Sequence, residues 1–330
     1  MPLKNSVIVG ESSCITKLRA YAEKVAASDA SVLITGETGT GKECLARYLH
    51  ECSRRAANQL ISINCSAVPD GLLESELFGY ERGAFTGAHS AFGGRLRMAS
   101  GGTLFLDEIG EMSPFAQAKI LRAIEEREVT PLGGRHSVPF DVRIVAATNV
   151  DPATLVRSGR LRKDLYYRLN VVHIHLPPIR DRKEDITFLF SHFMRQRLPP
   201  GTPIPSLNQS ALDHLLYHDW PGNVREIRNL VERLLVDLPE ADIGPENLPS
   251  EIRGAAVPSG GGNDDKARVL AALVSTHWNK RKAAQVLQWS RMTLYRKLAK
   301  YDIASKSARR LDTCRTCVTS GGDIASRRED

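Results

Sequence analysis

Short apolar runs alternate with helical patterns through the first half of the chain. Five runs rich in branched apolar residues are predicted to form strands, at residues 31–35, 60–64, 103–107, 142–147 and 171–176. Continuous apolar runs of this length are typical of strands that are buried on both faces. Helical patterns lie between them, as at 41–53 and 113–127. This alternation predicts an α/β fold with a parallel five-stranded sheet and right-handed crossovers.

The helical pattern at 113–127 carries its own start signal. Ser113 is the expected N-cap and Pro114 takes the first helical position, where proline loses no hydrogen bond. Ile120 and Ile124 follow on one face, which we expect to be buried.

After residue 182 the strand pattern stops, and residues 184–236 read as a small all-helical domain. Residues 253–263 are rich in Gly, Ser, Pro and Ala, which is typical of a flexible linker. A short helical unit follows, and the last residues have little apolar content and are expected to be disordered. The predicted divisions are a core at 6–178, a helical lid at 179–250, a linker at 251–263, a C-terminal unit at 264–303 and a tail at 304–330.

Composition narrows the class of protein. The 330 residues carry a net charge of +7, and Lys and Arg crowd the segment 266–310. This segment is either a solvated basic tail or a DNA-binding module. No apolar run is long enough to span a bilayer and no signal pattern opens the chain, so a cytoplasmic protein is expected. The six cysteines form no disulfide framework, and the pair Cys314 and Cys317 lacks the further ligands of a zinc site.

A glycine-rich loop follows the first predicted strand and opens a helix. Glycines at 36, 39 and 41 allow the backbone N–H groups to turn inward and cradle phosphates, and Lys42 supplies a positive charge. The alternative is a glycine-rich turn that happens to contain a lysine. Glu43 stands where the general motif has Ser or Thr. The candidate nucleotide-binding residues here are Gly36, Glu37, Thr38, Gly39, Thr40, Gly41, Lys42 and Glu43.

Two acids end the third predicted strand. Asp107 is placed to hold Mg²⁺, with Glu43 as a candidate second ligand, and Glu108 is placed to polarise the water that attacks a γ-phosphate. Two solvated acids at a strand end are the alternative. Asn149 follows the next strand and should lie at the same edge of the sheet, although Asn after a strand is usually a turn former.

Five stretches follow one another along residues 6–303: "GETGTGKE", "ESELFGYERGAFTGA", "GGTLFLDEIGEM", "DLYYRLNV" and "WPGNVREI". In these stretches and in their order the chain resembles the bacterial enhancer-binding proteins, the AAA+ ATPases that activate sigma-54 RNA polymerase. Glu43 is shared with that family. The resemblance implies an adenine pocket that includes Val9 and Gly10, a residue at Asn64 that restrains the catalytic glutamate, and sensor I at Asn149. It also implies arginine fingers at Arg162 and Arg168, which reach the neighbouring subunit's ATP in a hexameric ring, and sensor II at Arg225.

The resemblance also assigns a role to an apolar, glycine-rich stretch at residues 80–94. Its hexapeptide, Gly83, Ala84, Phe85, Thr86, Gly87 and Ala88, is implied to contact sigma-54. The stretch at 128–140 resembles a second loop that moves with it. The alternative is that residues 80–94 form a disordered surface loop without a partner. Only a few residues precede Val9, so no sensor domain is expected in this sequence, and control by a separate regulatory protein or by protein amount is implied. A piece cut from a longer protein is the alternative.

The C-terminal unit reads as three helices with helix-turn-helix spacing. Ala283, Ala284 and Leu287 should face inward, Ser290 should cap the third helix, and Leu294 with Leu298 should pack it. The unit resembles the Fis-type DNA-binding domain, which implies a dimer on two half-sites. A basic bundle that binds protein is the alternative. The candidate DNA-binding residues are Arg291, Thr293, Arg296 and Lys297.

Three functions are compatible with these features. The first is an ATP-driven activator that remodels sigma-54 RNA polymerase from enhancer DNA. The second is a DNA-binding regulator whose ATP site only sets the oligomeric state. The third is another AAA+ machine, such as a helicase or a clamp loader, against which the intact hexapeptide argues.

Overall fold

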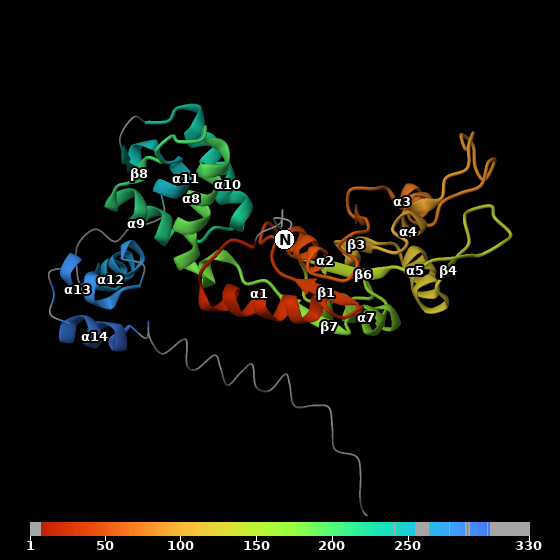
Figure 1. Ribbon diagram of the computed structural model, residues 1–330, viewed down its shortest axis with the longest axis horizontal. Coiled ribbons are helices and arrows are strands. Elements are labelled where there is room, and N and C mark those ends of the chain that lie inside the picture. Colours follow the sequence, from red (N-terminus) through yellow and green to blue (C-terminus); the bar gives the residue numbers. More distant parts are fainter. Residues whose placement is uncertain are drawn as a thin grey trace, which may run out of the picture. The chain divides into compact units, whose positions relative to one another are not determined.

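The computed structural model describes residues 8–239, 242–254, 264–276, 278–287, 289, 291–301 and 303. Within them, five parallel strands form one sheet in the order β2-β3-β6-β1-β7. The strands are β1 (Val32–Thr35), β2 (Leu60–Asn64), β3 (Thr103–Asp107), β6 (Arg143–Thr148) and β7 (Val172–His175) (Figure 1). The five predicted strands and the parallel sheet are therefore confirmed.

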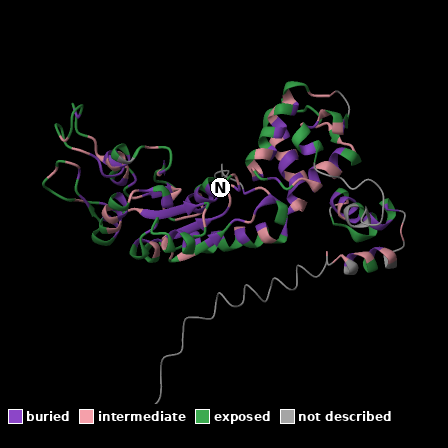
Figure 2. Ribbon diagram, turned by 180° about the vertical axis from the view of Figure 1, so that it is seen from behind, coloured by how far each residue is buried: buried purple, intermediate pink, exposed green. Residues whose placement is uncertain are grey.

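Helices cover both faces of the sheet, and Figure 2 shows its strands as mostly buried. On β3, Leu104 and Leu106 belong to one apolar cluster, while the intervening Phe105 belongs to the other. The helices of this part are α1 (Ser13–Ala26), α2 (Lys42–Glu51), α3 (Asp70–Phe78), α4 (Gly94–Met98), α5 (Pro114–Glu126), α6 (Pro152–Arg157) and α7 (Lys163–Leu169). Burial on both faces explains why the central strands β3, β6 and β1 read as apolar runs, whereas the edge strands β2 and β7 are only partly buried.

Helix α5 begins as its sequence predicts. The Ser113 hydroxyl accepts a hydrogen bond from the backbone N–H of Ala116 at 3.3 Å, and Pro114 is the first helical residue. Ile120 and Ile124 are both buried. The start signal and the buried face are confirmed.

A short segment of two 3-10 turns, η2 (Ile179–Asp181) and η3 (Lys183–Asp185), leads from the sheet to α8 (Ile186–Arg197). Helix α10 (Asn223–Val236) packs on α8, and both belong to the compact unit that contains the sheet. Residues 179–185 are called the strap below.

A second compact unit contains α9 (Gln209–Tyr217), α11 (Ser250–Arg253) and the C-terminal helices. It also contains η4 (Pro245–Asn247) and an unpredicted parallel pair, β8 (Ser206–Leu207) with β9 (Asp242–Ile243). Strands of two residues are too short to leave a periodic pattern. The division of the chain into predicted domains stays a prediction.

Three helices form the C-terminal unit: α12 (Asp264–Ser275), α13 (Lys280–Val286) and α14 (Arg291–Lys300). Ala283, Ala284, Leu287, Leu294 and Leu298 share one buried cluster, as predicted. The expected cap at Ser290, the linker residues 255–263 and the tail at 304–330 with its two cysteines lie outside the described residues.

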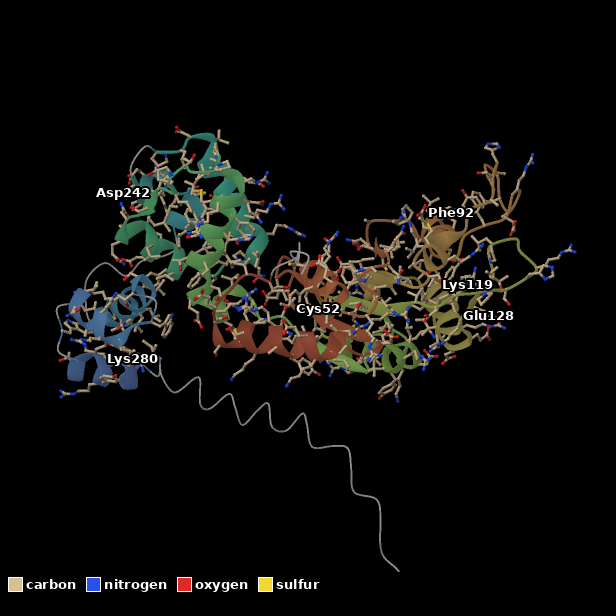
Figure 3. All side chains as sticks on the ribbon, viewed as in Figure 1. Cys52, Phe92, Lys119, Glu128, Asp242 and Lys280 are labelled. Carbon is tan, nitrogen blue, oxygen red and sulfur yellow. The ribbon has the colours of Figure 1, made fainter. Side chains whose placement is uncertain are left out.

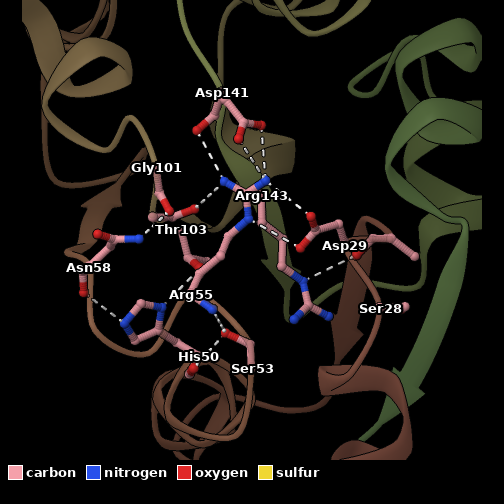
Figure 4. Close-up of polar contacts among 12 residues, drawn as sticks. Ser28, Asp29, His50, Ser53, Arg55, Asn58, Gly101, Thr103, Asp141 and Arg143 are labelled. Carbon is pink, nitrogen blue, oxygen red and sulfur yellow. Dashed lines mark hydrogen bonds and ion pairs between the residues drawn. The ribbon is translucent and has the colours of Figure 1, made fainter.

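Polar side chains form a cluster where β3 and β6 begin (Figure 4). Arg55 donates to both carboxylate oxygens of Asp29 at 3.1 Å and pairs with Asp141 at 2.9 Å. His50 contacts the Thr103 hydroxyl at 2.9 Å and the carbonyl of Asn58 at 3.1 Å. These bonds join α2 and the segment after it to the amino ends of β1, β3 and β6, at the sheet edge away from the predicted nucleotide site.

Candidate functional site: a phosphate loop and a paired-loop surface

The glycine-rich loop between β1 and α2 has the backbone of a phosphate cradle. Gly39 and Gly41 adopt φ values of 79° and 107°, which favour glycine. Gly41 is the N-cap of α2 and supplies no side-chain cap, so the first N–H groups of this ten-residue helix are open to an anion. Lys42 is buried, and its ammonium group donates to the carbonyl of Gly36 at 3.1 Å.

The two predicted acids lie next to that lysine. Lys42 Nζ is 3.4 Å from a carboxylate oxygen of Glu108, and the backbone N–H of Glu108 donates to Asp107 at 3.1 Å. Burial, and then the charge of Glu108, raise the pKa of Asp107 above its ordinary value. Glu108 itself adopts a left-handed backbone, with φ 54°, which is uncommon outside glycine. Such conformations recur at functional sites.

Asn149 links the acid to the loop. Its backbone N–H donates to the Glu108 carboxylate at 3.1 Å, and its side-chain amide donates to the Thr38 hydroxyl at 3.2 Å. Asn149 and Glu108 therefore lie together at the carboxyl edge of the sheet.

The residues present fit a magnesium nucleotide. An open helix start and a buried lysine suit phosphates, and Mg²⁺ usually takes one or two carboxylates together with phosphate oxygens. The Asp107 carboxylate suits that role. Within the described ranges no group of three or more His, Cys, Asp or Glu side chains is arranged to hold a metal alone. The Glu43 carboxylate is exposed and pairs with Arg47 at 2.8 Å.

Three further residues predicted to act on the nucleotide contact protein groups outside the phosphate loop and the acid pair. Asn64 is adjacent to Asp107 in the sheet register, but its side-chain oxygen accepts from Ser66 at 2.7 and 2.9 Å. Arg162 is exposed and pairs with Asp164 at 2.7 Å. Arg168 is exposed in α7 and donates to the carbonyl of Ile124 at 3.4 Å.

Two further predicted sites flank the loop. The backbone N–H of Arg225 donates to the carbonyl of Gly39 at 3.3 Å, and its side chain is exposed. Gly10 is buried beside Asp185, where a Cβ would lie 2.7 Å from the carboxylate. Val9, next to it, is half-buried.

Sequence reasoning missed the residues that assemble the surroundings of the loop. Asp185 is fully buried and accepts from the backbone N–H groups of Glu11 and Ser12 at 2.7 and 2.8 Å. Arg182, also buried, donates to the carbonyl of Thr40 at 3.3 Å. Asn223 is buried and donates to the carbonyl of Thr38 at 3.0 Å. Asn in the "WPGN" stretch was the available signal, since asparagine tolerates the φ of 53° found there.

The hexapeptide at 83–88 forms a closed tip. The N–H of Gly83 donates to the carbonyl of Ala88 at 2.9 Å, and Phe85 is 43% exposed with its ring centroid 5.0 Å from that of Tyr80. Tyr80 pairs with Phe92, labelled in Figure 3, at the base of the tip. The exposed aromatic is thus held against its own loop.

The second predicted loop lies against the first. It joins β4 (Glu128–Val129) to β5 (Val138–Pro139), after α5. Leu132 exchanges backbone hydrogen bonds of 2.9 Å with Gly79 and Glu81. Gly133 approaches Ala84 so closely that an added Cβ would lie 2.9 Å from the Cβ of Ala84.

The candidate DNA-binding residues lie on α14. Arg296 is exposed, and Thr293 and Lys297 are half-buried. The Lys297 ammonium lies over the Trp289 and Tyr301 rings, at 5.8 and 5.9 Å from their centroids. The side chain of Arg291 lies outside the described residues.

Comparison with protein families accounts for most of the chain. Residues 8–175 match the family model described as Sigma-54 interaction domain. Residues 180–263 match the AAA+ ATPase lid domain, and residues 265–301 match the bacterial regulatory proteins of the Fis family.

Individual relatives agree with these matches. The transcriptional regulatory protein ZraR of Escherichia coli is 45% identical over 301 residues, which cover 89% of this chain and 68% of ZraR. The DNA-binding transcriptional regulator NtrC of Rhizobium meliloti is 40% identical over 338 residues, covering 90% and 70%. Among solved structures, NtrX from Brucella abortus in complex with ATP matches with a TM-score of 0.74 at 32% identity, covering 89% of this chain and 69% of NtrX.

Proposed function

The chain belongs to the bacterial sigma-54-dependent activators of the AAA+ class, and from this premise we propose that it is an ATP-driven remodelling enzyme. It binds ATP with Mg²⁺, assembles from dimers into a ring, hexameric by family resemblance, and acts in the cytoplasm from enhancer DNA. Hydrolysis of ATP remodels the closed complex of sigma-54 RNA polymerase. In the part of the chain that the structure describes, no helix is suited to cross a membrane.

Each part of the phosphate site has a proposed role. The loop N–H groups and Lys42 hold the phosphates, and Asp107 holds Mg²⁺, which neutralises charge on the phosphate oxygens. Glu108 orients and polarises the attacking water. Its contact with Lys42 at 3.4 Å and with the N–H of Asn149 at 3.1 Å supports this role, because both keep its carboxylate at the loop.

Further residues sense the nucleotide or complete the site. Asn149 is the proposed sensor I, and its contact with Thr38 supports that role. Asn64 is proposed to restrain Glu108, and Arg225 to act as sensor II. Arg162, at the N-cap of α7, and Arg168, within α7, are proposed to reach a neighbouring subunit's nucleotide, and their exposure leaves them accessible to it.

The two loops are proposed to transmit the nucleotide state to sigma-54, with residues 83–88 as the contact. An exposed apolar tip is tolerable when a partner covers it for part of the cycle. The hydrogen bonds between Leu132 and the base of the first loop support movement of the two as a pair.

The C-terminal helices are proposed to bind enhancer DNA through Arg291, Thr293, Arg296 and Lys297 on α14. Lys and Arg on such a helix contact phosphates and base edges. The exposed guanidinium of Arg296 suits that role.

One observation carries the proposal: a phosphate loop with an adjacent acid pair occurs in one chain with the family's contact hexapeptide. The family match sets aside a helicase or clamp loader. A regulator whose ATP site only sets its oligomeric state is the competing function. Coupling between hydrolysis and transcription separates the two.

The test is the variant Thr86→Ala, at an exposed position of the tip. We expect normal ATP turnover and loss of transcription from a sigma-54 promoter, because only the contact with sigma-54 is changed. Ser90→Ala, an exposed residue of the same loop outside the hexapeptide, is the matched control and should transcribe normally. Full transcription by Thr86→Ala would overturn the contact assignment.

A further inference from the structure

The phosphate loop contains an acid that does not suit phosphates. Glu37 follows Gly36 directly, and its backbone carbonyl accepts from the hydroxyl and the N–H of Thr40, at 2.8 and 3.3 Å. A free carboxylate in such a loop repels a polyphosphate, since charges a few Å apart near a protein surface interact strongly. The sequence alone grouped Glu37 with the nucleotide-binding residues.

The Glu37 side chain is held by the strap and by the start of α10. Arg180 of the strap binds both carboxylate oxygens, one of them at 2.7 Å, in a bidentate pair. The side-chain amide of Asn223 adds a hydrogen bond at 3.3 Å. The Arg180 hydrogen bonds hold the pKa of Glu37 below its ordinary value, so the carboxylate is charged at neutral pH.

The backbones of the loop and of α10 meet at the same place. The N–H of Val224 donates to the carbonyl of Gly39 at 3.0 Å. A Cβ on Gly39 would lie 2.3 Å from the carbonyl oxygen of Gly222, so only glycine fits. Asn223 also accepts from the N–H of Ile179 at 2.9 Å, which ties the strap to the same point.

We propose that Glu37 is a positioning residue rather than a phosphate ligand: with Arg180 and Asn223 it latches the strap and the start of α10 to the phosphate loop. Arg180 has a second task, which is to neutralise the Glu37 carboxylate beside the phosphates. This inference rests on the proposed function, since it concerns the nucleotide of that site.

If Arg180 neutralises Glu37, the single and double variants should differ in nucleotide affinity in a pattern that a merely structural ion pair would not produce. Arg180→Gln leaves the Glu37 charge uncompensated, so ADP and ATP should bind about two- to fivefold more weakly, the range for one half-exposed charge. Glu37→Gln removes the charge and keeps the shape, so affinity should stay near that of the wild type. The double variant should regain affinity, because no unpaired carboxylate is left.

The experiment measures binding of a fluorescent ADP analogue, then KM and kcat for Mg-ATP, in the full chain. KM should follow the binding pattern, and kcat should change little. Arg228→Gln is the matched control, because Arg228 pairs with Glu232 on α10 at 3.1 Å with similar exposure. Its affinity should equal that of the wild type.

Two results would overturn the inference. Unchanged nucleotide affinity in Arg180→Gln would show that the ion pair between Arg180 and Glu37 has no effect on the nucleotide. A double variant whose affinity is as low as that of Arg180→Gln would show that Arg180 acts on the nucleotide directly. A wild-type chain that binds neither nucleotide would instead remove the proposed function, so the two failures are distinguishable.

Discussion

At the scale of single residues, a few buried polar side chains each hydrogen-bond to several segments of the chain. Asn223 is fully buried and serves the strap, the phosphate loop and α10, through Ile179 and Thr38. His50 is similarly placed in the polar cluster of Figure 4. Its Nε2 faces the carbonyl of Asn58, which only accepts, so the proton lies on Nε2, and Nδ1 accepts from the Thr103 hydroxyl.

Asn223→Ala should lower the free energy of unfolding by about 1–3 kcal/mol, because it leaves buried backbone groups unpaired. Urea denaturation monitored by fluorescence measures the change. Gln196→Ala, which removes an exposed amide on α8, should stay within about 0.5 kcal/mol of the wild type. Equal midpoints for the two variants would show that Asn223 is not needed to hold these segments together.

His50 gives a pH dependence with a defined sign. Burial lowers its pKa below the ordinary 6.5, so the folded state prefers the neutral ring. Its stabilising contribution is fully present above about pH 6.5 and is lost as the pH falls towards the folded-state pKa, since the unfolded chain binds the proton more readily.

His50→Gln should therefore flatten the fall of Tm between about pH 7 and about pH 5. Scanning calorimetry across that range measures the slope. His136→Gln, at an exposed loop position, should leave the slope of the wild type. A slope in His50→Gln as steep as that of the wild type would show that His50 does not titrate with folding.

At the scale of elements, the two loops after α3 and α5 behave as one surface. Gly133 has a φ of 72°, and its contact with Ala84 leaves no room for a side chain. A residue larger than glycine would strain the second loop and separate it from the tip.

Gly133→Ala should keep ATP turnover and lower open-complex formation about fivefold or more, since a left-handed alanine costs about 1 kcal/mol or more. The measurement is transcription from a sigma-54 promoter, normalised to the ATPase rate. Gly201→Ala, at φ 88° with no atom near its added Cβ, controls for backbone strain alone. Normal coupling in Gly133→Ala would mean that the loops act independently.

The elements also show how far a sequence can predict this molecule. The central strands β3, β6 and β1 could be predicted because burial on both faces makes them apolar runs, and α5 could be predicted because Ser113 and Pro114 mark its start. The strands β8 and β9 could not be predicted, because two residues are too few to show a periodic apolar pattern. Asp185 lies 174 residues from Glu11 in the chain, so its contact depends on tertiary folding and no local signal encodes it. The catalytic and contact roles stay predictions from motif resemblance.

At the scale of the whole molecule, the proposed nucleotide residues gather at the carboxyl edge of the sheet. In α/β folds ligands bind at that edge, where loops bring side chains from distant segments together. Lys42 and the backbone N–H of Asn149 both contact the Glu108 carboxylate there, and the strap and α10 reach the same loop. A change in the nucleotide can therefore act on several segments at once.

The most direct test of the account is open-complex formation on a sigma-54 promoter by Glu108→Ala, with ATP binding measured in the same preparation. We expect near-normal ATP binding, no turnover and no open complexes from Glu108→Ala, while Lys42→Ala should fail to bind ATP at all. Open complexes formed by Glu108→Ala at the wild-type level, without turnover, would contradict the claim that hydrolysis drives the remodelling.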